Sequence, residues 1–174
     1  MHQVFRDLFS QEELEDINFQ FVSKCKKEYQ DDDIFNRSKL TLLGTKFKGP
    51  YITKIKYSIL EANKTFNMTL FEDTPIEKWN LSTYTDDGFC TSHNDIIEGV
   101  DWQRKLTVII ELFRNCEGGE LEMSDQDFVK NKIPLNLQPG DAVVFPSFVN
   151  HSVTPLISGS RQSLTGWVKG PPLT

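Results

Sequence analysis

The chain has 174 residues, a formal net charge of −6 and 38% hydrophobic residues, enough to bury one core. The acidic balance argues against a protein that holds a nucleic-acid backbone, because such proteins need a clustered basic surface. No apolar stretch has the length of a signal peptide or a membrane span, and three cysteines without metal-finger spacing are typical of free thiols. We therefore expect one cytoplasmic domain over residues 1–174, with no nucleic-acid partner and no membrane.

Residues 1–75 are predicted to be a helical support. Ser10, followed three residues later by Glu13, is a capping-box signal. The apolar stripe after it consists of Leu14, Ile17, Phe21, Val22 and Cys25. Residues 31–50 contain an acidic triplet and a Gly-Pro step, which indicate a connection, either a mobile lid or a plain loop. The second helical stripe consists of Ile52, Ile55, Ile59, Ala62 and Phe66.

The pattern changes to β after Pro75. Short segments separated by turn residues follow one another: KWNLSTYT, FCTSHND, RKLTVIIELF, GELEM, IPLNLQ, DAVVFP, HSVTPLI and SRQSLTGWV. Such a series predicts a mainly β fold with flanking α-helices, a jelly roll of two Greek keys over residues 76–170 with the N-terminal helices packed on one sheet. A sandwich of another topology is the alternative.

One histidine and one aspartate lie two positions apart in the second of these segments. His93 and Asp95 project to the same side of an extended strand. His2 lies at a terminus that is expected to fray, whereas His151 begins the seventh segment, which a jelly roll pairs with the second. Two imidazoles and a carboxylate form the facial triad of non-haem Fe(II) sites, which leaves positions open for chemistry. Zinc, or a histidine that is merely hydrogen bonded, is the alternative.

Ten residues after His151 lies Arg161. Alternation places Arg161, Ser163 and Trp167 on one face of the last strand, which can look across the interior toward the metal. No acidic residue lies near Arg161 in the sequence, so a buried guanidinium here is suited to gripping the carboxylate of a ligand. A surface arginine beside a hairpin is the alternative.

The segments TYTDDGFCTSHNDI, GGELEM and PGDAVVFPSFVNHSVTPLISGSRQSLTGWV, taken in order, resemble the Fe(II)- and 2-oxoglutarate-dependent dioxygenases, specifically their prolyl 4-hydroxylase-like branch. The resemblance covers residues 79–168 and implies a double-stranded β-helix, which is the jelly roll predicted above. It also implies roles for six residues: Fe(II) ligands at His93, Asp95 and His151, a grip on the C5 carboxylate of 2-oxoglutarate by Arg161, and further cosubstrate contacts from Tyr84 and, as in an R-x-S variant, Ser163.

The resemblance further implies an oxidoreductase that hydroxylates an unactivated C–H bond and consumes dioxygen and 2-oxoglutarate, releasing succinate and CO2. The expected substrate is a prolyl or similar residue of a peptide or protein; free amino acids and small metabolites are alternatives, and L-ascorbate is a candidate additional cofactor. Asp95 favours hydroxylation over halogenation, because halogenating relatives carry a small residue there. A non-catalytic jelly roll that binds a metal or small ligand, and a zinc hydrolase, are the competing functions.

Two residues depart from the family pattern. Cys90 stands three before the metal histidine, where relatives often have tyrosine, and Glu111 stands in TVIIELF where an apolar residue is commoner. We expect a strand irregularity to turn Glu111 outward, because an inward carboxyl must find a partner or take up a proton. The loop around Trp102 and the basic 37–56 region are expected to roof the site. The alternative for Trp102 is simple packing, and for the basic region a solvated face or loop. The sequence carries no sign of the oligomeric state.

Overall fold

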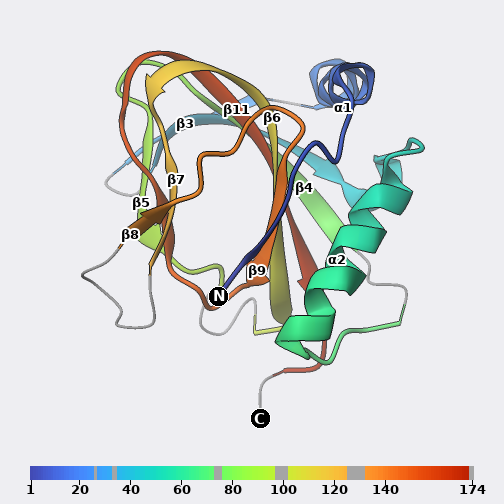
Figure 1. Cartoon of the computed structure of the whole chain (residues 1–174). Coiled ribbons are helices and arrows are strands. Elements are labelled where there is room, and N and C mark those ends of the chain that lie inside the picture. Colours follow the sequence, from blue (N-terminus) through green and yellow to red (C-terminus); the bar gives the residue numbers. More distant parts are fainter. Residues whose placement is uncertain (26, 33–34, 73–75, 97–101, 125–131, 173–174) are drawn as a thin grey trace.

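The computed structural model describes residues 1–25, 27–32, 35–72, 76–96, 102–124 and 132–172. Within them, antiparallel strands form a curled sheet, with two helices on its outside (Figure 1). The strands are β1 (Gln3–Phe5), β2 (Lys27–Asp31), β3 (Phe35–Leu43), β4 (Ile76–Tyr84), β5 (Phe89–His93), β6 (Arg104–Gly118), β7 (Leu121–Ser124), β8 (Lys132–Pro134), β9 (Ala142–Pro146), β10 (His151–Val153) and β11 (Leu156–Lys169). The helices are α1 (Gln11–Lys24) and α2 (Ile52–Phe66), with a 3-10 turn at Gly44–Lys46.

The strand pairing is that of a jelly roll. The eight segments predicted after Pro75 pair first with eighth (β4 with β11), second with seventh (β5 with β10), third with sixth (β6 with β9) and fourth with fifth (β7 with β8). One wall runs β1-β9-β6-β11-β4-β3 and continues through β3 into β5-β10-β7-β8, which forms the other wall. The predicted fold class is thus confirmed.

Both predicted helices form and cover the outer face of the longer wall (Figure 1). Ser10 caps α1 with the expected capping box. Helix α1 buries Leu14, Ile17 and Phe21, but Val22 is 68% exposed, so its place in the predicted stripe was wrong. Each helical residue turns by about 100°, and Val22 therefore points about 100° away from Phe21. In the described part of the chain, neither helix is long and apolar enough to cross a membrane.

A large apolar core lies between the helices and the longer wall. Ile55 and Ile59 of α2 belong to the same buried cluster as Trp79, Leu81 and Leu164 of the sheet. Burial of such side chains contributes roughly 1.5–3 kcal/mol each. This core holds the outer face of β4 and β11 in place, so that the alternate side chains of these strands face the interior of the roll.

The expectation that residues 31–50 form a lid or loop was wrong for 35–43, whereas 44–50 are a connection that contains the 3-10 turn. Residues 33–34 lie outside the described residues, but 27–31 and 35–43 are strands β2 and β3, and β3 pairs with β4 inside the main sheet. The N-terminal 75 residues are therefore not only a helical support. Strand β3 alternates, with Leu42 packed in the helix-side core while Arg37 and Lys39 line the interior.

Candidate functional site

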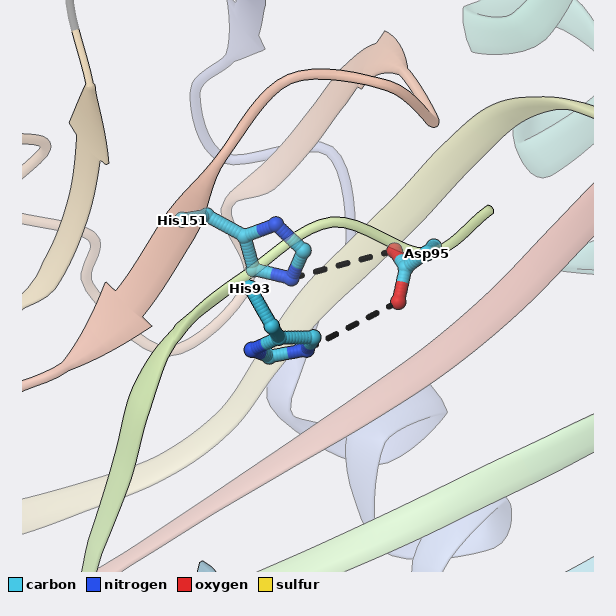
Figure 2. Close-up of side chains that lie close together, drawn as sticks. All are labelled: His93, Asp95 and His151. Atoms are coloured by element: carbon cyan, nitrogen blue, oxygen red, sulfur yellow. Dashed lines mark ion pairs between the residues drawn. The ribbon is translucent and has the colours of Figure 1, made fainter. Parts of the chain in front are cut away.

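Three predicted ligand residues meet at one point inside the roll. His93, at the end of β5, lies directly opposite His151, at the start of β10, in the strand register. One ligand atom from each of His93, Asp95 and His151 lies within 4.8 Å of the others, and these three form a potential metal cluster among the described residues. The Asp95 carboxylate faces both imidazoles, with His93 Nε2 at 3.8 Å from Oδ1 and His151 Nε2 at 3.7 Å from Oδ2 (Figure 2).

Hydrogen bonds behind the two imidazoles set the nitrogen that each presents. His93 Nδ1 lies 2.8 Å from the Thr91 carbonyl oxygen and His151 Nδ1 lies 3.1 Å from the Val149 carbonyl oxygen. A carbonyl only accepts, so the proton of each neutral ring sits on Nδ1 and Nε2 keeps its lone pair for a cation. Burial lowers the pKa of His151, although Asp95 opposes the shift. Neutral His151 is the form that binds a metal.

Asp95 is held rigidly although it follows the end of β5. Its backbone N–H donates to the Ser147 carbonyl (2.9 Å), and its backbone carbonyl accepts from Arg104 (3.1 Å). The Thr107 hydroxyl donates to Asp95 Oδ2 (2.7 Å) and lies 3.0 Å from the Ser147 hydroxyl. Oδ1 is thereby left to face His93. Supporting bonds of this kind orient metal ligands, and Thr107 and Ser147 were not anticipated from the sequence.

The triad opens onto a cavity of about 220 Å³ with a polar wall. Arg161 lies opposite Tyr84, Ser163 opposite Ser82, and Thr165 opposite Asn80 across β11 and β4, and all six line the cavity. Arg37 and Lys39 of β3 extend the wall by one more strand. The prediction that Arg161, Ser163 and Trp167 face the interior is confirmed.

Arg161 has an acidic partner that its sequence neighbours did not reveal. Its Nε donates to Glu111 Oε1 (2.9 Å) and its Nη2 to Glu111 Oε2 (2.6 Å), with both side chains fully buried. The expectation that a strand irregularity turns Glu111 outward was wrong. Both carboxylate oxygens accept an N–H, which is the geometry of an ionised carboxylate.

One N–H group of Arg161, on Nη1, takes no part in the ion pair with Glu111. Burial raises the pKa of Glu111, opposed by Arg161, while the facing carboxylate raises the pKa of Arg161 in spite of its burial, so the guanidinium stays charged. Arg161 Nη1 is buried and has no hydrogen-bond partner among the residues that the structure describes. An unpartnered charged donor beside a cavity is costly, and an anion in the cavity would satisfy it.

Tyr84 lies between two guanidinium groups. The Arg161 guanidinium carbon is 5.6 Å from the Tyr84 ring centre, and Arg37 Nη1 donates to the Tyr84 hydroxyl (3.2 Å). Burial raises the pKa of Tyr84, so its hydroxyl keeps its proton. Because the hydroxyl oxygen accepts from Arg37, its own proton is available to a ligand.

Cys90 stands beside the triad. Its Sγ lies 3.4 Å from His93 Nδ1, and burial raises the pKa of the thiol to about 12. The three cysteines of the chain are free, as predicted. A protonated thiol is a weak donor and a poor nucleophile, so Cys90 packs against the site as a small apolar group.

The expected roof is described only in part. Residues 97–101 of the loop lie outside the described residues, and Trp102 is 45% exposed. Of the basic 37–56 region, Arg37 and Lys39 reach the cavity, whereas Lys54 of α2 binds Glu13 of α1 (2.7 Å). The sequence missed Arg37 as a site residue, although its alternation with Leu40 and Leu42 was the signal of a strand with one polar face.

Both a family model and curated proteins match part of the chain. Residues 79–169, just over half of the chain, match the model of the 2OG-Fe(II) oxygenase superfamily. A PKHD-type hydroxylase from Idiomarina loihiensis is 27% identical over 96 residues, 54% of this chain and 43% of that protein. A PKHD-type hydroxylase from Psychrobacter sp. is 31% identical over 83 residues, 48% of this chain and 31% of that protein. The match thus spans less than half the length of either curated relative.

Solved structures show the same fold over nearly the whole chain. A prolyl-4-hydroxylase from Pseudomonas putida superposes with a TM-score of 0.75 at 18% identity, covering 98% of this chain and 92% of that one. The viral collagen prolyl hydroxylase of Paramecium bursaria Chlorella virus-1, crystallised with 2OG, gives a TM-score of 0.70 at 16% identity, covering 98% and 96%. At these identities the likeness establishes the architecture.

Proposed function

The chain belongs to the 2OG-Fe(II) oxygenase superfamily, and on that premise we propose that it is a hydroxylase that inserts one oxygen atom of dioxygen into an unactivated C–H bond while 2-oxoglutarate becomes succinate and CO2. The observation that carries this proposal is the convergence of His93, Asp95 and His151 within 4.8 Å at the edge of a cavity. Two imidazoles and one carboxylate suit Fe(II) and leave coordination positions open.

The metal residues have distinct tasks. Nε2 of His93 and of His151 and a carboxylate oxygen of Asp95 would hold the Fe(II) ion, which would supply the oxidising chemistry once 2-oxoglutarate and dioxygen are also bound. Thr107 takes the second oxygen of Asp95 and fixes its rotamer. The Val149 and Thr91 carbonyls keep both rings in the metal-binding tautomer.

The polar wall orients the cosubstrate. Arg161 Nη1 is the buried donor that awaits an acceptor, and the Tyr84 hydroxyl offers a second proton beside it. We assign both to the distal carboxylate of 2-oxoglutarate, with Ser163 in the next row of the same wall as an additional donor. The apolar residues Ile109, Leu121 and Val153 complete the lining and exclude water from the reaction.

The proposed substrate is a prolyl or similar residue of a peptide or protein. Support comes from the architecture, which this chain shares with two prolyl hydroxylases of known structure. Free amino acids and other small molecules are competing substrates, and L-ascorbate is proposed as an auxiliary reductant.

Two experiments test the proposal. Anaerobic addition of Fe(II) and then 2-oxoglutarate should give a visible metal-to-ligand band, which is lost in Asp95→Asn and kept in Glu77→Gln, a control that removes an exposed carboxylate from β4. Peptide pools incubated with the aerobic enzyme should yield succinate and a product one oxygen atom heavier. Metal binding without succinate formation would favour a ligand-binding module, and hydrolysis without oxygen would favour a zinc enzyme.

A further inference from the structure

The cavity carries more positive than negative side chains. Arg37, Lys39, Arg104 and Arg161 line it, against Asp95 as the lining carboxylate among the described residues. Two of the cations already face acids: Arg161 is bound by Glu111, and Lys39 lies 3.5 Å from Glu28. Arg37 differs from these two, because every partner that it contacts in the described part of the chain is neutral.

Arg37 is held in place without being neutralised. Its Nε donates to the Gln30 side chain (3.2 Å), its Nη1 to Ser82 Oγ (3.0 Å) and to Tyr84 Oη (3.2 Å). The guanidinium lies 4.2 Å from the ring centre of Phe35. Within the described ranges, Nη2 donates to no residue. Residues of three strands, β2, β3 and β4, therefore hold the guanidinium in place and leave its Nη2 group available to a ligand.

The charge balance of the proposed cosubstrate site indicates what that ligand is. Fe(II) with two neutral imidazoles and the Asp95 carboxylate carries one net positive charge, and the 2-oxoglutarate dianion changes this to one net negative charge. The Arg161–Glu111 pair contributes no net charge. An uncompensated charge inside a protein is strongly unfavourable, so the cavity needs a cation beyond the neutral Arg161–Glu111 pair. Of the other cations that line it, Arg37 is the one that donates a hydrogen bond to Tyr84, beside Arg161 on the wall assigned to the distal carboxylate.

We propose that Arg37 is this cation, and that it binds the distal carboxylate of 2-oxoglutarate together with Arg161 Nη1 and the Tyr84 hydroxyl. The proposal rests on the proposed function and extends it to a residue outside the jelly-roll core. Strand β3 places Arg37 beside β4, and β4 carries Tyr84 directly opposite Arg161. One carboxylate can therefore be approached from adjacent strands of the same wall.

In the hydrogen bond between Arg37 and Tyr84, Arg37 is the donor. The Tyr84 hydroxyl oxygen accepts from Arg37 and donates its proton onward, so a carboxylate bound there strengthens both hydrogen bonds. Cosubstrate selectivity follows from this arrangement. A 2-oxo acid without the second carboxylate has nothing to offer Arg37, and it loses the whole contribution of the cation.

The test compares two ligands that differ in the distal carboxylate. Calorimetry should follow the binding of 2-oxoglutarate and of 2-oxobutyrate to the Mn(II)-loaded protein, in wild type, Arg37→Met and Arg37→Lys. We expect Arg37→Met to weaken 2-oxoglutarate binding by at least about tenfold, the effect of one charge-assisted hydrogen bond. Binding of 2-oxobutyrate should change less than about twofold on the same scale, and Arg37→Lys should lie between. Lys56→Met, on the exposed face of α2, controls for net charge.

The outcomes separate this inference from the proposed function. If wild type binds 2-oxoglutarate and Arg37→Met binds it equally well, Arg37 does not contact the distal carboxylate and the inference fails alone. Equal weakening of both ligands would also overturn it, because a disturbed site, rather than a lost cation, would be the cause. A wild-type protein that binds Mn(II) but neither ligand would overturn the proposed function itself.

Discussion

Replacing Glu111 by glutamine should be among the most destabilising single substitutions in this fold. Glu111 is 0% exposed and Arg161 1% exposed, and the guanidinium makes two short hydrogen bonds to the carboxylate. Breaking a buried ion pair by removing one partner costs about 3–5 kcal/mol. Glutamine keeps one acceptor oxygen, so we expect the lower end, about 3 kcal/mol. For a domain of this size each kcal/mol lowers Tm by about 2–4 °C, which gives a decrease of about 6–12 °C.

The assay is a double-mutant cycle measured by urea unfolding of the metal-free protein. Glu111→Gln, Arg161→Met and the double variant give the coupling free energy between the two side chains. Glu117→Gln is the matched control, because it removes an exposed carboxylate from the same strand. The double variant should be more stable than the sum of the two losses predicts, since it leaves no unpaired charge.

The stability of the Arg161→Met variant should also depend on pH, because the Glu111 carboxyl can take up a proton. In Arg161→Met the Glu111 carboxyl, whose pKa burial already raises, loses the guanidinium that opposed the shift. A carboxyl with a raised pKa in the folded state destabilises the fold at a pH above that value and ceases to do so as the pH falls through it. Arg161→Met should therefore recover stability on mild acidification. A Glu111→Gln loss below about 1 kcal/mol, with additive single effects, would refute the reasoning.

Three further predictions concern the metal site, a helix cap and a close packing contact. Asp95→Ala should weaken Mn(II) binding by more than about 100-fold in a calorimetric titration, while the fold stays intact by circular dichroism. Even the loss of a group that only hydrogen-bonds a metal ligand reaches that size. Ser10→Ala should cost about 1 kcal/mol of unfolding free energy. The hydrogen bond from Lys54 of α2 lowers the pKa of Glu13. The free energy of unfolding of Glu13→Gln should therefore be lower than that of wild type at neutral pH, and the two should converge as the pH falls through that lowered pKa. Gly166→Ala would place a Cβ 2.5 Å from a Trp79 ring carbon and should cost about 1–3 kcal/mol by thermal unfolding, whereas an unchanged Tm would mean that the ring moves aside freely.

The strand order and the clustering of His93, Asp95 and His151 could be predicted from the sequence, because local signals determine both. Turn residues separate the β segments, and jelly-roll pairing joins the second segment to the seventh. His93 and His151 therefore had to meet, and the register places them opposite each other. Asp95 follows from the two-residue period of an extended chain.

The ion-pair partner of Glu111 could not be predicted from the sequence. The side of β6 to which the Glu111 side chain points could have been. Thr107, Ile109 and Glu111 share a parity along β6, so an inward Thr107 implies an inward Glu111. An irregularity in the β6–β11 register does exist, between Gln162 and Ser163, but it leaves Glu111 buried. The sequence does not show that Glu111 and Arg161 are close in space. They are 50 residues apart along the chain, and only the pairing of β6 with β11 brings the two charges together.

The missed strand β3 shows how a basic segment can be an interior element. Its charged residues suggested a solvated surface, yet Leu42 packs beneath the helices while Arg37 and Lys39 face the cavity. A strand can bury one apolar face in a core and line a binding site with the other, provided that a ligand satisfies the polar side. Strands β4 and β11 follow the same rule, with Leu81 and Leu164 outward and Tyr84 and Arg161 inward. Polar residues that alternate with core residues therefore indicate the polar wall of the cavity as clearly as the histidines indicate the cluster around Asp95.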